Sequence, residues 1–69
     1  KITDAKSLGI AIRERRKALK YTQAFLSEFT GLSASFISDL EHGKPTAEIE
    51  KTLLVINTLG MDLYVEKRG

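Results

Sequence analysis

Cysteine is absent from this chain of 69 residues, and histidine occurs only once. Without cysteine, the fold has neither a disulfide framework nor a thiolate metal site. A single histidine excludes a metal or catalytic centre built from several imidazoles. A folded domain of this size buries only about 60% of the surface of its unfolded chain. Its stability must therefore come from tight helix packing or from a partner subunit.

Long apolar segments are also missing. The two longest uncharged runs, residues 29–38 and 52–61, have ten residues each, whereas a membrane-spanning helix needs about 20. The N-terminal residues show no signal-peptide pattern. The chain has no glycine-rich phosphate loop and no pair of acid, histidine or cysteine residues at a catalytic spacing. We therefore expect a cytoplasmic protein that is not an enzyme and has no membrane segment, metal or cofactor.

The charges are unevenly distributed, although the net charge is only +2. Residues 13–20 contain five cations and one acid, whereas most of the acids follow residue 40. A concentrated basic segment suits contact with a polyanion such as nucleic acid. A solvated helix face explains the same cluster equally well at this point. The five cations are Arg13, Arg15, Arg16, Lys17 and Lys20.

Apolar residues at helical spacing predict two helices before Gly31. The first covers residues 5–19, with Asp4 as its N-cap, and the second covers residues 23–30, with Thr22 as its N-cap. Gly31 follows at the position where a helix commonly ends in the left-handed conformation. The residues expected to face inward are Leu8, Ala11, Ile12 and Leu19 in the first helix and Leu26, Ser27 and Thr30 in the second.

Two further helices and one strand are predicted after Gly31. Ser33 caps a helix to about residue 42, with Ile37 and Leu40 facing inward, and Thr46 caps a fourth helix that ends at Leu59. The expected inward residues of the fourth helix are Ile49, Leu53, Ile56 and Leu59.

The last segment changes its period from helical to alternating, which is typical of a strand. Met61, Leu63 and Val65 alternate with polar residues or tyrosine. A single strand is not stable in water. It must pair with an extended N-terminal segment around Ile2 or with the same strand of a second subunit.

The segment from Thr22 to Thr46, TQAFLSEFTGLSASFISDLEHGKPT, resembles the helix-turn-helix of the Xre family, which includes the lambdoid phage repressors. The resemblance implies an all-α, lambda-repressor-like bundle of four to five helices, with a DNA-binding domain over residues 1–60. The alternative is a small helical bundle that uses the same packing without binding DNA. The residues that carry the resemblance are Thr22, Gln23, Leu26, Gly31, Leu32, Ser33, Ile37, Ser38, Leu40, Glu41, Gly43 and Lys44.

The segment GKPT followed by AEIEKTLLVINTLGMDLYVE resembles the HipB-type branch of this family. Members end in a short strand that pairs across a dimer axis, which implies a dimerisation segment over residues 61–69. HipB-like proteins repress their own operon and neutralise a HipA-type kinase toxin. The resemblance thus implies a homodimeric antitoxin that binds an inverted-repeat operator on the bacterial nucleoid. The alternatives are a protein-interaction module and a stand-alone regulator without a toxin. The expected dimer residues are Met61, Leu63, Val65 and Leu54.

The resemblance also implies the residues that contact DNA. Small residues at the start of the third helix match the positions that enter the major groove, where serine can bond to several bases and alanine can touch a thymine methyl group. Asp39 departs from the family pattern, which often has a neutral or basic residue at this position. Phosphate repels an acid that faces DNA, so Asp39 either accepts from a cytosine amino group or lies out of reach. The start of the second helix and Lys44 are expected to contact phosphates. The set is Thr22, Gln23, Ser33, Ala34, Ser35, Ser38, Asp39 and Lys44.

Two further pairs of residues have expected roles, one in holding the fold and one in packing or partner binding. In the phage repressors the positions of Arg16 and Glu41 form an internal ion pair, which the resemblance implies here too. Phe25 and Phe29 lie four residues apart and therefore share one helix face. Either the rings are covered by Ile2, Tyr21 or the C-terminal segment, or they form a contact patch for a partner.

Overall fold

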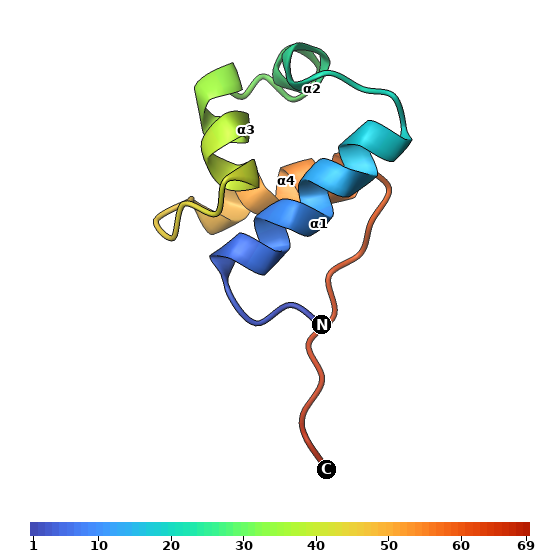
Figure 1. Ribbon diagram of the computed structural model, residues 1–69, viewed down its shortest axis with the longest axis vertical. Helices are drawn as coiled ribbons and strands as arrows, with labels where there is room; N and C mark the ends of the chain where they lie inside the picture. The colour runs from blue at the N-terminus through green and yellow to red at the C-terminus, as the bar shows by residue number, and fades with distance from the viewer.

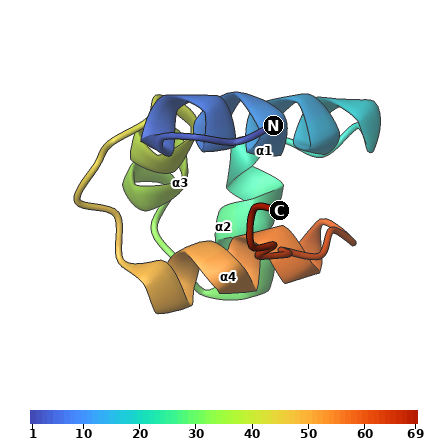
Figure 2. The same ribbon diagram turned by 90° about the horizontal axis from the view of Figure 1, so that it is seen from below.

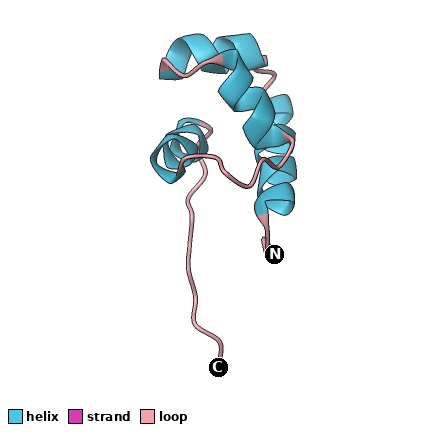
Figure 3. Ribbon diagram, turned by 90° about the vertical axis from the view of Figure 1, so that its left-hand side faces the viewer, coloured by secondary structure: helices cyan, strands magenta, loops and turns pink.

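The computed structural model describes residues 1–69 and contains four helices and no strand (Figures 1 and 3). The helices are α1 (Ala5–Ala18), α2 (Gln23–Thr30), α3 (Ala34–Glu41) and α4 (Ile49–Thr58). The all-α prediction is confirmed, with four helices. None of these helices has both the length and the apolar character needed to cross a membrane.

Three of the predicted helix starts are confirmed by their capping hydrogen bonds. The Asp4 carboxylate accepts from the backbone N–H of Ser7 at 2.8 Å. The hydroxyl oxygens of Thr22 and Ser33 each accept from the backbone N–H three residues further on, at 2.9 and 3.0 Å. Each cap satisfies one of the N–H groups that a helix leaves without an internal acceptor.

The start and the buried face of α4 differ from the prediction. The helix begins at Ile49 after Glu48, whereas Thr46 lies in the preceding loop and caps nothing. Ile49 is 61% exposed, and Thr52 is buried instead. Thr52 can be buried because its hydroxyl donates to the carbonyl oxygen of Glu48 at 2.8 Å. Hydropathy alone favoured Ile49 over Thr52. The buried residues of α4 and its C-cap are Thr52, Val55, Ile56 and Leu59, and Leu53 is only half-buried.

A small core lies where the four helices meet. In Figure 2, α1 and α4 lie on opposite sides of the molecule, and α2 and α3 connect them. Helix α3 contacts α1 and α2, and α2 also contacts α4. With only seven apolar residues in the core, each substitution there affects a large share of the total burial. These residues are Ile12, Leu26, Ile37, Leu40, Val55, Ile56 and Leu59.

Gly9 lies inside α1 at the closest approach of α1 to α3. A Cβ atom at this position would lie 2.5 Å from the carbonyl oxygen of Leu40 and 2.6 Å from that of Glu41. Glycine is therefore required for the backbones to approach this closely. The sequence itself contains one indication of this contact. A glycine within a helix costs about 1 kcal/mol relative to alanine, so its presence there needs a compensating reason.

The C-terminal tail, residues 61–69, has no regular secondary structure. Met61 packs against the core, but Tyr64 is 80% exposed and Val65 is 94% exposed. The tail lies beside the N-terminal residues around Ile2 (Figure 1), and no backbone hydrogen bond joins the two segments. The strand is not formed within one chain, so its pairing with a second subunit stays a prediction.

Replacing Gly9 with alanine (Gly9→Ala) should destabilise the protein, although alanine is the better helix former. The added methyl group meets backbone oxygens rather than a flexible side chain, and overpacking of this kind costs about 1–3 kcal/mol. In a domain of this size, each kcal/mol lowers Tm by roughly 4–8 °C. Thermal denaturation followed by circular dichroism measures the change. Lys17→Ala, on the exposed face of the same helix, should leave Tm nearly unchanged. An unchanged or higher Tm for Gly9→Ala would mean that α1 and α3 are further apart than described.

Candidate nucleic-acid interface

A rigid turn joins α2 to α3. Gly31 ends α2 in the left-handed conformation, with φ 77°. The Ser27 hydroxyl donates to the carbonyl oxygen of Leu32 at 2.6 Å, and the Thr30 hydroxyl accepts from the N–H of Leu32 at 3.2 Å. These side chains satisfy both backbone polar groups of Leu32 within the turn. Ser27, which the sequence analysis placed on the inward face of α2, thus has a specific polar role in the turn.

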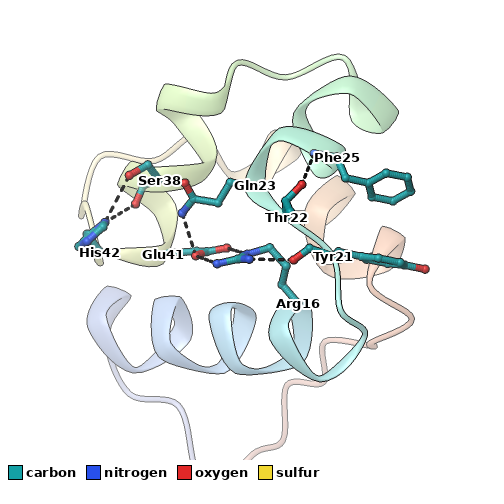
Figure 4. Close-up of polar contacts among 8 residues, drawn as sticks. All are labelled: Arg16, Tyr21, Thr22, Gln23, Phe25, Ser38, Glu41 and His42. Atoms are coloured by element: carbon teal, nitrogen blue, oxygen red, sulfur yellow. Dashed lines mark hydrogen bonds and ion pairs between the residues drawn. The ribbon is translucent and has the colours of Figure 1, made fainter.

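A buried ion pair joins α1 to α3. Arg16 Nε donates to Glu41 Oε2 at 2.7 Å, and Arg16 Nη2 donates to Glu41 Oε1 at 3.0 Å. The third nitrogen, Nη1, donates to the carbonyl oxygen of Tyr21 at 2.8 Å, and the Gln23 amide donates to Glu41 Oε1 at 3.0 Å. Figure 4 shows these groups together between α1, α2 and α3. This is the internal pair that the resemblance implied, extended by Tyr21 and Gln23.

The pair keeps both groups charged. Burial raises the pKa of the Glu41 carboxyl, but hydrogen bonds from Arg16 and Gln23 outweigh burial and bring the pKa below its ordinary value of 4.5. The hydrogen bond to Glu41 raises the pKa of Arg16. Glu41 therefore stabilises the fold above its unfolded pKa, and this contribution is lost as the pH falls through the lowered folded pKa.

The N-terminal end of α3 presents small, exposed residues. Ser33, Ala34 and Ser35 are exposed, whereas Ser38 and Asp39 are partly buried. The Ser33 hydroxyl oxygen already accepts the N–H of Phe36, so its own proton remains available for donation. A surface of small groups at a helix start lets that helix approach another polar surface closely.

The C-terminal half of α3 is more constrained than its start. His42 Nδ1 lies 2.7 Å from the Ser38 carbonyl oxygen and 3.5 Å from the Ser38 hydroxyl, so His42 acts as a polar cap at the end of α3. Lys44 Nζ lies 3.5 Å from a carboxylate oxygen of Asp39. This exposed pair is weak, but it places a cation beside the acid that departs from the family pattern.

The start of α2 combines an exposed hydroxyl with free helix N–H groups. Thr22 is exposed, and the first N–H groups of a helix have no internal acceptor. Gln23 is half-buried, and its amide is committed to Glu41. The Gln23 side chain thus connects the start of α2 to the ion pair. The contact of this helix start with phosphate stays a prediction.

The five clustered cations have different surroundings. Arg16 is buried in the ion pair, and Arg15 Nε donates to the carbonyl oxygen of Leu59 at the end of α4, at 2.9 Å. The remaining three are exposed and form no ion pair: Arg13, Lys17 and Lys20. The sequence did not indicate the role of Arg15, because its acceptor lies 44 positions away.

The phenylalanine pair is exposed, as the partner hypothesis requires. Phe25 is 45% exposed and Phe29 is 68% exposed. The Tyr21 ring packs against Phe25 with ring centroids 4.7 Å apart, which is one of the covering contacts that we considered.

No group of three or more histidine, cysteine or acidic residues is arranged to hold a metal ion.

Comparison with known proteins identifies the family. The family model described as Helix-turn-helix matches residues 12–65. This chain belongs to the helix-turn-helix family. The HTH-type transcriptional regulator y4mF of Sinorhizobium fredii is 40% identical over 62 residues, covering 90% of this chain and 82% of that protein. The ImmF control region 10 kDa protein of Bacillus phage phi105 is 31% identical over 67 residues, covering 93% and 71%. Transcriptional regulators of this family are not enzymes.

Solved structures of HipB have the same fold as this helix-turn-helix protein. HipB in a complex with an O4 20mer gives a TM-score of 0.90 at 19% sequence identity, covering all of this chain and 97% of that one. A HipB variant in a complex with an O2 20mer gives 0.90 at 20% identity, covering 96% of its chain. The likeness therefore extends over the whole chain and shows the fold.

Replacing Glu41 with alanine (Glu41→Ala) should strongly destabilise the helix-turn-helix. The change leaves the Arg16 guanidinium buried without its partner, which costs about 3–5 kcal/mol in a buried pair. Urea denaturation at pH 7 and again near pH 3 measures the difference from the unmodified protein. That difference should shrink at the lower pH, because protonation then weakens the pair in the unmodified protein as well.

Glu48→Ala is the matched control for this experiment. Glu48 pairs with Lys51 at 3.4 Å on the exposed surface, where such pairs are worth about 0–1 kcal/mol. Equal stabilities for the two variants would show that the ion pair between Arg16 and Glu41 does not hold α1 to α3.

Proposed function

We propose that this protein is a sequence-specific DNA-binding repressor that binds an inverted-repeat operator as a dimer. We further propose that it is the HipB-like antitoxin of a type II toxin–antitoxin operon, acting on the bacterial nucleoid in the cytoplasm. The exposed start of α3 carries the proposal. Helix α3 is the recognition helix, and Ser33, Ala34 and Ser35 at its start enter the major groove.

The recognition helix suits readout by small side chains. Serine hydroxyls donate to or accept from several base edges, and Ala34 fits against a thymine methyl group. Ser38 lies further along the same helix, where His42 restrains it. Asp39 either accepts from a cytosine amino group or lies out of reach beside Lys44. No arginine faces the groove for strong guanine readout, so specificity depends partly on DNA shape.

Phosphate contacts surround the recognition helix. Helix α2 begins at Gln23, and its first N–H groups and the Thr22 hydroxyl suit an anion. Lys44 follows α3 and supplies a cation near the same surface. The exposed cations of α1 add attraction at longer range, and those that do not touch DNA are merely solvated. They are Arg13, Lys17 and Lys20.

Dimerisation is supported by the amount of surface that one chain exposes. The accessible surface is 5139 Å², about 800 Å² more than the roughly 4,300 Å² expected for a folded chain of this mass. A standard interface covers about 800 Å² on each partner. Leu54 is 43% exposed and Leu63 is 46% exposed. Pairing of residues 61–66 across a two-fold axis would satisfy the strand backbone and cover these side chains.

The antitoxin role rests on the likeness to HipB, and a HipA-type kinase is the proposed toxin. A stand-alone regulator is the second candidate, because the relatives from Sinorhizobium fredii and phage phi105 are named for regulation or control alone. The neighbouring gene distinguishes the two candidates. A kinase gene beside this one, whose product binds this protein, supports the antitoxin role, and its absence supports the stand-alone regulator.

Replacing Ser35 with glutamate (Ser35→Glu) should weaken operator binding at least about tenfold. The change places an unpaired anion in the groove, and mismatched contacts there cost about 1–3 kcal/mol. Fluorescence anisotropy with DNA from upstream of the gene itself measures the affinity. Asn57→Glu adds the same charge to an exposed site on α4 and serves as the control, and both variants should keep the circular dichroism spectrum of the unmodified protein.

The salt dependence of the same binding separates DNA recognition from protein interaction. An operator-binding protein neutralises several phosphates, so its affinity falls steeply as salt rises. A module that only binds a protein partner has no such slope with this DNA. Equal affinities for Ser35→Glu and the unmodified protein would remove α3 from the DNA interface.

Removing residues 62–69 should abolish the dimer and operator binding together. This truncation keeps Met61, which packs against the core. One recognition helix reads only a half-site, whereas two helices about 34 Å apart reach successive major grooves. Sedimentation and DNA binding measure the two effects. A truncated protein that remains a tight dimer would move the interface elsewhere, and the exposed face of α4 around Leu54 would be the next surface to test.

A further inference from the structure

Three aromatic rings lie in a row along the outer face of α2, two of them on the helix and one, Tyr21, just before its start, where Tyr21 also packs against the core. We name Tyr21, Phe25 and Phe29 the aromatic ladder. Ring centroids lie 4.7 Å apart between Tyr21 and Phe25 and 5.9 Å apart between Phe25 and Phe29, where the rings are stacked. Phe25 and Phe29 lie outside the core and are 45% and 68% exposed. Adjacent exposed aromatic rings of this kind mark contact sites.

The ladder faces away from the proposed recognition helix α3, although Tyr21 and Phe25 lie next to Thr22 at the start of α2. In Figure 4 the rings of Tyr21 and Phe25 point to the side of α2 opposite α3. Figure 1 shows α2 at one end of the longest axis, 41 Å long, and the C-terminal residue at the other end. A molecule bound at the ladder would therefore block neither the start of α3 nor the end of the tail.

We propose that the aromatic ladder binds the same ladder of a second copy, with the two α2 helices antiparallel. The ring spacing on the two sides of Phe25 is similar. A two-fold axis beside Phe25 thus places this ring on its own equivalent and Phe29 toward the N-terminal end of the other α2. Offset or stacked rings at such distances attract one another in addition to the apolar area that they bury.

The charges at the two ends of the ladder suit this arrangement. Glu28 lines a shallow hollow with Phe25 and Phe29 near the C-terminal end of α2. Lys20 is exposed at the other end, beside Tyr21, and neither charge has an ion-pair partner within the chain. Antiparallel helices bring Glu28 of one copy toward Lys20 and the Tyr21 hydroxyl of the other. The same exchange occurs twice around the axis, as a two-fold contact requires.

The effect of the ladder contact on DNA binding rests on the tail-mediated dimer that we proposed above. If the tails form one dimer contact and the ladders form a second contact at the opposite end, dimers on neighbouring operator sites can touch. The ladder contact is small and therefore weak in free solution. On DNA with two sites, it would raise the occupancy of the second site once the first is filled.

Engineered cysteines test the geometry directly, because the natural chain has none. In a Lys20→Cys, Glu28→Cys double variant, which keeps all three rings, the thiol at position 28 of one copy faces the thiol at position 20 of the other, so mild oxidation should link two copies about tenfold faster than in a variant with a distant thiol. Ile10→Cys is that control, since Ile10 is 48% exposed on α1. Equal linking rates for the two variants would overturn the two-fold contact.

Sedimentation of the full chain gives a second, independent measurement. From micromolar to about millimolar concentration, the unmodified protein should gain mass beyond its basal state. Phe29→Glu should abolish that gain, because the new carboxylate would be buried without a partner, whereas Ile10→Glu should retain it.

The outcomes separate the ladder from the tail. Loss of the basal dimer on removal of the tail, with no effect of Phe29→Glu, would support the tail contact and overturn the ladder contact. If Phe29→Glu lowers the mass of a protein that does not dimerise through its tail, the ladder contact stands and the proposed dimer falls. A Phe29→Glu variant that matches the unmodified protein in mass but loses affinity for a purified toxin would assign the ladder to that partner and overturn self-association.

Discussion

The buried pair between Arg16 and Glu41 holds α3 in place against α1. It is the polar contact that joins α1 to α3. It also reaches the segment between α1 and α2 through the Tyr21 carbonyl, and the first residue of α2 through the Gln23 amide. The core has only seven apolar residues, so apolar packing alone specifies the helix orientations weakly. Directional hydrogen bonds to a shared carboxylate restrict the angle between α1, α2 and α3. The pair thereby contributes orientation more than net stability.

Gly9 works with this ion pair. The missing side chain lets the backbone of α1 approach the carbonyl oxygens of Leu40 and Glu41, and the approach brings Arg16, two turns further along α1, within reach of the Glu41 carboxylate. Arg15 connects the same helix to the end of α4 through the Leu59 carbonyl. Helix α1 thus fixes the position of α3 and of the point at which the tail begins. It therefore sets where the proposed DNA surface and the proposed dimer surface lie relative to one another.

The exposed surfaces explain why so small a domain would act in assemblies. The chain exposes more surface than its mass predicts, and the exposed apolar side chains include Leu63, Tyr64 and Val65 of the tail at one end and the phenylalanine rings of α2 at the other (Figure 1). Exposed apolar surface on a domain with a minimal core is costly unless a second molecule covers it. Partner binding would stabilise the fold, more strongly the tighter the binding, so folding would be coupled to the assembly that we propose.

The sequence by itself determined the features that depend on neighbouring residues. Asp4, Thr22 and Ser33 cap their helices as predicted, and Gly31 takes the left-handed conformation, because capping and backbone strain act within a few residues. The resemblance to the phage repressors added the prediction that Arg16 pairs with Glu41. Tertiary structure alone decided that Thr52 is buried and Ile49 exposed, that Gly9 marks a close contact, and that Arg15 reaches the end of α4. Each of these depends on groups distant in sequence, which periodicity and propensity do not register. The predicted strand is not formed within one chain, because a strand needs a neighbour for its backbone groups and the N-terminal segment beside the tail makes no backbone hydrogen bond to it.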